Sequence, residues 1–270
     1  RKESYEMARM MFARALLIDP NYARAYAGAA DCCSMLYMYF ESTRENLREA
    51  EAASSRAVEI DPESAAAHAS RGLALSLSDK YEDSGREFEK AIALDPKLFE
   101  GHYFYARSLF AQGQLEAAAR FFTKAAEVDP EDYQAPMLLA LVHGGLEQEE
   151  AFARESQRAL EKVERHLEIQ PDDHRALVMG GALQARLGNN EKAHAWIGRA
   201  TTIESDNPSV WYNAACAYAM IGDVDQAIDA LESSIDSGLG DARWIENDPD
   251  LEPLRDNERF KELLARAQKG

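Results

Sequence analysis

The chain has 270 residues, of which 46% are hydrophobic and 29% charged, a balance typical of folded rather than disordered proteins. Its 30 Lys and Arg against 48 Asp and Glu give a formal net charge of −18. This negative excess argues against a nucleic-acid binder and against docking on anionic membranes, because both need cationic side chains. Three cysteines are too few for a disulfide framework, so a reducing, cytoplasmic location is expected. A periplasmic location stays open because the chain begins at Arg1.

The first predicted element is an amphipathic helix over residues 1–20. In it a small, a bulky and a small residue, Ala8, Phe12 and Ala15, precede the final proline by 12, 8 and 5 positions. The same spacing recurs before two later prolines and, in weaker form, near the others. The prolines of this pattern stand at positions 20, 62, 96, 130, 171 and 208, and are 42, 34, 34, 41 and 37 residues apart.

A period of 34 residues is that of the tetratricopeptide repeat, which consists of two antiparallel helices. With the positions above, the chain resembles a tetratricopeptide-repeat array over nearly its whole length. The resemblance implies an all-α fold, a right-handed superhelical solenoid of antiparallel helix pairs. We expect a half repeat over residues 1–20, six full repeats over 21–241 with boundaries near 62, 96, 130, 171 and 208, and a C-terminal turn and capping helix over 242–270.

Several of the expected elements depart from the regular repeat. The first and fourth full repeats carry 8 and 7 additional residues, close to two helical turns each, which predicts longer helices near Met35–Asn46 and Leu146–Gln157. The half repeat lacks its first helix, so we expect the chain to be cut from a longer protein. Its uncovered apolar face could instead pair with a second copy through Met7, Met10, Met11 and Leu17.

The array is expected to end in a turn over residues 243–255, where two prolines and several acidic residues precede a last helix at about Glu258–Gln268. This tail and the opening stretch 13–28 are similar to the repeat regions of bacterial multidomain signalling proteins. In that group the array follows a serine/threonine kinase, a nucleotide cyclase or a winged-helix regulator, often with a TolB-like segment. The resemblance implies a regulatory module and carries over no catalytic activity.

Residues with catalytic or metal-binding chemistry form no recognisable motif. The six histidines give no HExxH pair and no zinc spacing with cysteine, and His68 and His102 are expected to pack within helices. The glycine pair at 180–181 is expected to permit close helix packing, and the three cysteines to be buried. No metal or cofactor is therefore expected, and the chain is predicted not to be an enzyme. A hydrolase or transferase site among its many carboxylates is the less favoured alternative.

The best candidate site is the surface of the first helices, which lines the concave groove in tetratricopeptide arrays. By that resemblance, repeat positions 2, 5, 9 and 12 point into the groove from one side of each helix. Four arginines against two acids then give the groove a charge of +2 within a chain of −18. The residues assigned to it, with one neighbour at position 13, are Arg24, Asp31, Leu73, Glu100, Tyr103, Arg107, Phe110, Met137, Leu141, Arg175, Val178, Arg186 and Tyr212.

Arginine can hold a carboxylate through two hydrogen bonds, and aromatic and methionine side chains provide apolar anchors. The groove therefore predicts a protein-interaction scaffold for an acidic and apolar peptide, a partner domain, or a missing N-terminal domain of the same protein. Homo-oligomerisation through residues 1–20 is the alternative. The Lys and Asn pattern that holds the C-terminal carboxylate of heat-shock chaperones is absent, since Ala27 and Asp31 occupy the first pair of those positions.

Overall fold

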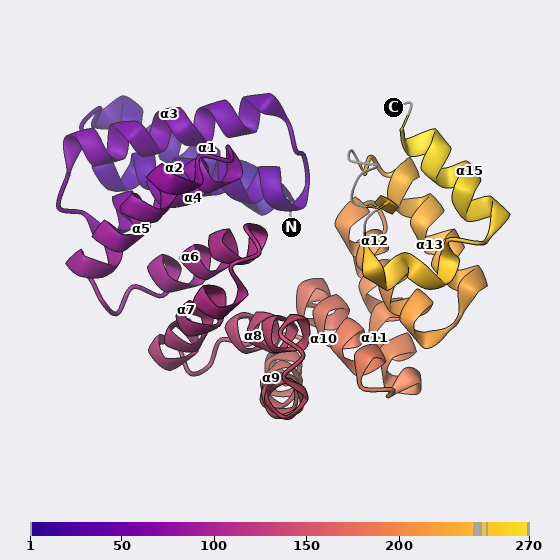
Figure 1. Cartoon of the computed structure of the whole chain (residues 1–270). Coiled ribbons are helices and arrows are strands. Elements are labelled where there is room, and N and C mark those ends of the chain that lie inside the picture. The colour runs from indigo at the N-terminus through magenta and orange to yellow at the C-terminus, as the bar shows by residue number, and fades with distance from the viewer. Residues whose placement is uncertain (1, 240–244, 247, 269–270) are drawn as a thin grey trace. The chain divides into compact units, whose positions relative to one another are not determined.

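The computed structural model describes residues 2–239, 245–246 and 248–268, and these residues form α-helices and one 3-10 helix without a strand (Figure 1). The predicted all-α fold is thereby confirmed. The chain divides into two compact units, Arg1–Glu155 and Ser156–Gly270, here called unit 1 and unit 2. None of the helices described combines the length and the apolar character needed to span a membrane.

Unit 1 consists of helical hairpins whose first helices pack on one another. Helices α2, α4 and α6 pack against α3, α5 and α7 respectively, and they also contact each other in sequence order. Helix α1 packs on α2, and α8 packs on α7. The helices are α1 (Lys2–Ile18), α2 (Ala23–Tyr39), α3 (Arg44–Ile60), α4 (Ala65–Leu77), α5 (Tyr81–Leu94), α6 (Phe99–Ala111), α7 (Leu115–Val128), α8 (Gln134–Gly145) and the first turns of α9 (Glu149–Ile169).

Unit 2 also consists of helical hairpins, but after the last hairpin it ends in a 3-10 helix and a single α-helix. Hairpins form between α10 and α11 and between α12 and α13, while α10 also packs on α12. A 3-10 helix, η1, packs on α12, and the last helix, α15, packs on α13. Besides the rest of α9, the elements are α10 (His174–Arg186), α11 (Asn190–Ile203), α12 (Pro208–Ile221), α13 (Val224–Asp236), η1 (Pro249–Leu254) and α15 (Glu258–Ala267).

The tail expected over residues 242–270 can be followed in part. Positions 240–244, 247 and 269–270 lie outside the described residues, so the first part of the predicted turn is not covered. Of that turn, residues 248–255 contain η1, and a last helix begins at Glu258 as expected. Because Phe260 and Leu263 of α15 join the core of unit 2, this helix covers the end of the repeats.

The recurrent small and bulky residues explain how each hairpin closes. Phe88 of α5 is fully buried and lies over Gly72 of α4, where an added Cβ would come within 2.9 Å of the ring. Ile197 of α11 lies over Gly181 of α10 in the same way, with 2.7 Å to the position of an added Cβ. The glycines thus allow the close helix packing expected from the sequence, and bulky partners fill the space.

A second recurrent contact ties three of the repeats to the turn before them. The Nε2 atoms of His68 and His102 each lie 2.9 Å from a backbone oxygen six residues earlier, in Pro62 and Pro96. Trp211 donates its indole N–H across the same separation, 2.6 Å to the Ser205 oxygen. Histidine and tryptophan therefore have the same structural role, a hydrogen bond to the backbone of the preceding turn. This role explains why the two histidines are buried, and no catalytic role is needed to explain it.

The additional residues of two repeats lie in helices. Helices α2 and α3 have 17 residues each, against 13 in α4 and 14 in α5. Helix α9 has 21 residues, against 14 in α7. The extension of α2 reaches Tyr39, a residue that becomes important for the candidate site.

Candidate functional site

The candidate groove residues differ widely in exposure. Leu73, Tyr103, Met137, Val178 and Tyr212 are buried against neighbouring helices. Asp31, Arg107, Leu141 and Arg175 are half-buried, and Arg24, Glu100, Phe110 and Arg186 are exposed. The set therefore combines buried side chains that pack between helices with side chains whose polar groups are accessible. Both units contribute residues to the set.

In unit 1 the structure brings an arginine between two tyrosines. Arg107 of α6 donates a hydrogen bond from Nη1 to the phenol oxygen of Tyr39, from α2. Its guanidinium carbon lies 5.5 Å from the centre of the Tyr39 ring and 5.9 Å from that of Tyr103. Both distances fall in the range of cation–π attraction. We call these three residues, with Asp31 and Leu73, the unit-1 face.

Arg107 keeps its positive charge in the folded protein, although no acidic side chain among the described residues pairs with it. Burial lowers the pKa of its guanidinium, yet the phenol oxygens of Tyr39 and Tyr103 outweigh this, so the pKa lies above its usual value. No carboxylate among the described residues lies within ion-pair distance of it. A half-buried, permanently charged fork without a counter-ion is well suited to an incoming carboxylate.

The same face carries an acid on α2 that bonds to a hydroxyl rather than to a cation. Burial, with a smaller contribution from the charge of Glu100, raises the pKa of Asp31 to about 7 against the opposing effect of a hydrogen bond with Ser70. Three successive first helices thus meet here, since Ser70 lies on α4 and Glu100 on α6. The unit-1 face therefore carries an acidic side chain as well as Arg107.

In unit 2 the corresponding side chains are engaged by the protein's own tail. Tyr212 donates its hydroxyl to Asp248 Oδ2 at 2.7 Å, and Arg186 donates to Asp250 Oδ2 at 2.5 Å. Leu251 and Leu254 of η1 are fully buried beside them. Two of the residues expected in the groove thus contact the tail in this structure. We call Arg186, Tyr212 and Cys216 the unit-2 face.

The cysteines are buried and unpaired, as expected. Burial raises the pKa of Cys32 and of Cys33 to about 11, so neither thiol is activated at neutral pH. Burial also raises the pKa of Cys216, whose Sγ lies 3.7 Å from Asp248 Oδ2.

Cys216 and the two aspartates of the tail lie close enough to be considered as a metal site. In this structure Tyr212 and the cationic Arg186 already hold the two carboxylates. The contacts of these aspartates are thereby accounted for by the attachment of the tail.

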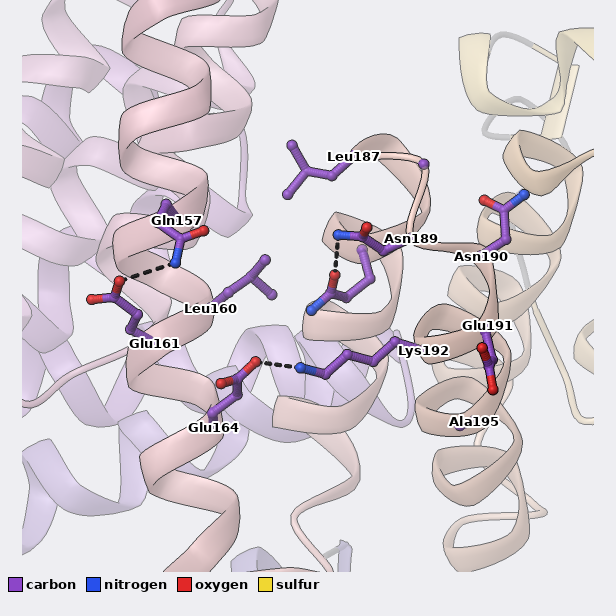
Figure 2. A pocket seen from close by; sticks show the side chains of 12 residues that line it. Gln157, Leu160, Glu161, Glu164, Leu187, Asn189, Asn190, Glu191, Lys192 and Ala195 are labelled. Atoms are coloured by element: carbon purple, nitrogen blue, oxygen red, sulfur yellow. Dashed lines mark hydrogen bonds and ion pairs between the residues drawn. The ribbon is translucent and has the colours of Figure 1, made fainter.

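An open pocket of about 890 Å³ lies in unit 2 between α9 and the α10–α11 turn (Figure 2). Its polar side chains bond to one another: Lys192 pairs with Glu164, and Asn189 donates to Gln184 Oε1 at 2.8 Å. Leu160 and Leu187 are part of its lining. These groups do not converge on one point, so the pocket has no arrangement of nucleophile, base and acid.

Comparison with known proteins identifies the repeats. A family model described as Tetratricopeptide repeat matches residues 75–142, and a second one with the same description matches residues 208–237. The chain contains tetratricopeptide repeats. No catalytic family is indicated by these matches. The predicted repeat is thus confirmed within both units, whereas the similarity to bacterial signalling proteins is not shown.

Solved structures support the same fold. The APC/C hetero-tetramer Cut9–Hcn1 has a TM-score of 0.67 at 19% identity, over 97% of this chain and 52% of that one. The human IFIT1 dimer with PPP-AAAA has a TM-score of 0.63 at 16% identity, over 100% of this chain and 69% of that one. At such identities the likeness shows the fold alone.

One curated protein, a chloroplast protein of Arabidopsis thaliana, has a short matching region. It is 43% identical over 53 residues, which are 20% of this chain and 16% of that protein. This chain therefore spans about half of the matched chain of the Cut9–Hcn1 structure and a small part of the Arabidopsis protein.

Sequence reasoning found Tyr103 and Arg107 but missed two sets of residues. Tyr39 lies in the extension of α2, outside the repeat phase, and only the 8-residue insertion pointed to that region. Asp248 and Asp250 lie in a tail that follows no repeat. The paired acids were noticed there, but their contact with helices α10 and α12 depends on how η1 packs.

Proposed function

We propose that this chain is a protein-interaction scaffold whose unit-1 face binds a peptide that carries carboxylates and apolar residues. The observation that supports this most is Arg107, held between Tyr39 and Tyr103 without a carboxylate partner among the described residues. The tetratricopeptide fold suggests the same class of function, because stacked helical hairpins present extended surfaces to other proteins.

Unit 2 provides an internal example of such recognition. Tyr212 and Tyr103 stand at the same position of their repeats, each one residue after the Trp or His that contacts the preceding turn. On the unit-2 face, the tyrosine and an arginine bind two aspartates, while leucines of the same segment are buried. A ligand with alternating carboxylate and apolar side chains would use the unit-1 face in a comparable way.

The proposal is tested with a fluorescently labelled peptide copied from residues 246–256 and a control peptide in which its acids become amides. Anisotropy should show binding of the acidic peptide only. Arg107→Glu should weaken binding at least about tenfold, because hydrogen bonds to charged groups contribute about 1.5–3 kcal/mol. Arg120→Glu makes the same charge change at an exposed position of α7 and should leave the affinity within about twofold.

The affinity should also fall as salt is added, since an arginine–carboxylate contact is screened. Equal affinity of the Arg107→Glu variant and the unmodified protein would remove the assignment of this face. Binding of the control peptide as tightly as the acidic one would show that carboxylates are not what is recognised.

We also propose that the repeats are the regulatory part of a larger bacterial signalling protein, arranged as six units with the boundaries given above. This rests on the resemblance of residues 13–28 and of the tail to such arrays. Sequencing the complete reading frame tests it. A kinase, cyclase or DNA-binding domain ahead of Arg1 would support the proposal, and a reading frame with none of them would contradict it.

A further inference from the structure

Helix α1 exposes a continuous apolar stripe. Met7, Met10 and Met11 are about 60% exposed, and Leu17 is 85% exposed, whereas no residue of this helix is buried. Methionine side chains adapt their shape to a partner, and a patch of this kind is unusual on a surface that faces only solvent.

The side of α1 that faces α2 is covered less completely than the equivalent side of later repeats. Phe12 lies over Gly28 of α2, as Phe88 lies over Gly72. Phe88 and Phe122 are fully buried because their helices also pack against a first helix of their own hairpin. Phe12 stands at the same repeat position but stays half-exposed. Its helix packs closely on α2 and contacts α3 through the ion pair between Arg9 and Glu49.

The stripe has the spacing of a helix–helix seam. Positions 3, 7, 10, 14 and 17 follow one another at intervals of four and three residues, so Glu3, Met7, Met10, Arg14 and Leu17 lie along one line on α1. Among the described residues, neither Glu3 nor Arg14 has an ion-pair partner. Along this line, Glu3 precedes the two methionines and Arg14 follows them.

We infer that a second copy of this chain covers the stripe, with the two α1 helices antiparallel. In that arrangement the residue at position 3 of one copy faces position 14 of the other, and position 7 faces position 10. Each Glu3 then meets an Arg14 of the other copy, and Met7 packs on Met10. A parallel pair would oppose Glu3 with Glu3 and Arg14 with Arg14, which like-charge repulsion disfavours.

Charge also favours this part of the surface for self-association. The chain as a whole carries −18, so most surfaces of two copies repel each other. Residues 2–18 carry three cations (Lys2, Arg9, Arg14) against two acids (Glu3, Glu6), a net charge of +1. The interface is symmetric, uses the same residues on both copies, and is independent of peptide binding by the unit-1 face.

Sedimentation equilibrium of the 270-residue chain measures the association. We expect a reversible monomer–dimer equilibrium, and at least about a tenfold rise in the dimer dissociation constant for either Glu3→Arg or Arg14→Glu alone. The double variant that exchanges the two charges should return to within about threefold of the unmodified chain. Ile169→Glu, an equally exposed apolar position on α9, is the control and should change nothing.

Disulfide cross-linking tests whether the two α1 helices are antiparallel. On oxidation, the Met7→Cys/Met10→Cys double variant should form cross-linked dimers far faster than either single variant, because positions 7 and 10 face each other. Rapid cross-linking of both single variants would indicate a parallel pair and overturn the antiparallel register. A chain that stays monomeric at all concentrations, or a dimer that neither charge reversal weakens, would overturn the inference as a whole. Helix content measured by circular dichroism confirms that each variant is folded.

Discussion

The unit-1 face and the unit-2 face each contain a tyrosine at the same repeat position, but the two tyrosines have different neighbours. Tyr103 and Tyr212 occupy equivalent sites, but four residues later one repeat has Arg107 and the other has Cys216. In unit 2 the tail brings Asp248 to the tyrosine. In unit 1 Arg107 lies beside the tyrosine instead, and no carboxylate among the described residues is within ion-pair distance of it. The two faces therefore differ at this one position and in the presence of a tail.

The tail of unit 2 is held as part of a core rather than as a removable lid. Ile245, Leu251 and Leu254 are fully buried with the side chains of α12 and α13. Burial of three large apolar side chains stabilises the attachment far more than the polar contacts do. The contacts of the tail are therefore part of the folded core of unit 2.

The largest expected effect tests whether the tail is integral to unit 2. Leu254→Ala should lower the free energy of unfolding by about 2–5 kcal/mol, because it leaves a cavity in a fully buried site. Thermal unfolding by calorimetry measures the change. Ile169→Ala, at a position 81% exposed, should stay within about 0.5 kcal/mol. An equally small loss for Leu254→Ala would mean that the tail is only loosely attached and that the unit-2 face can open as well.

The packing inside the hairpins should respond alike in both units. Gly72→Ala and Gly181→Ala should each lower the free energy of unfolding by about 1–3 kcal/mol, since the added Cβ meets Phe88 or Ile197 below 3.0 Å. Gly198→Ala is the matched control, because this helical glycine has open space around the added carbon. It should raise the stability by about 0.5–1 kcal/mol. Costs that differ strongly between the first two variants would show that the two units are not built alike.

The pH dependence of stability should differ between Asp31, which has no cationic partner among the described residues, and Asp250, which pairs with Arg186. The pKa of Asp31 is raised from 3.8 to about 7, so between these pH values the folded state keeps a proton that the unfolded state has released. Stability therefore falls as the pH rises from about 4 to about 7. Asp31→Asn removes this loss and should stabilise unit 1 by about 1–3 kcal/mol above pH ~7.

Below about pH 4 the same substitution should have almost no effect, because Asp31 is then protonated in both states. Asp250→Asn in unit 2 is the comparison. Burial and the charge of Asp248 raise the pKa of Asp250 too, but Arg186 opposes them, and Asp250→Asn leaves that arginine without its partner. Its gain at high pH should therefore be smaller than that of Asp31→Asn. Melting curves of the three proteins across the pH range decide the matter, and a pH-independent effect of Asp31→Asn would contradict the assigned burial.

The sequence predicted the scaffold better than it predicted the two faces. Phe88 and Phe122 could be placed because each local repeat determines which helix positions are buried. Arg107 and Tyr103 were assigned to the groove for the same reason. Tyr39 and Asp248 could not be found in this way, because one lies in an insertion and the other in a tail. Their contacts, 68 and 36 residues away along the chain, arise from tertiary packing alone.

The smallest expected effect compares the two equivalent tyrosines directly. Tyr212→Phe removes a hydrogen bond of 2.7 Å to the Asp248 carboxylate and should lower the free energy of unfolding by about 1.5 kcal/mol. Tyr103→Phe removes a long, neutral bond of 3.4 Å to Gln134 and the contact of the phenol oxygen with Arg107. It should cost less, about 0.5–1 kcal/mol, because Arg107 keeps its hydrogen bond to Tyr39. The order should reverse for binding of the acidic peptide, because only Tyr103 lies beside Arg107. Urea unfolding and anisotropy titration of the same two variants provide both readouts, and equal losses in both would mean that the two faces do not differ in what they bind.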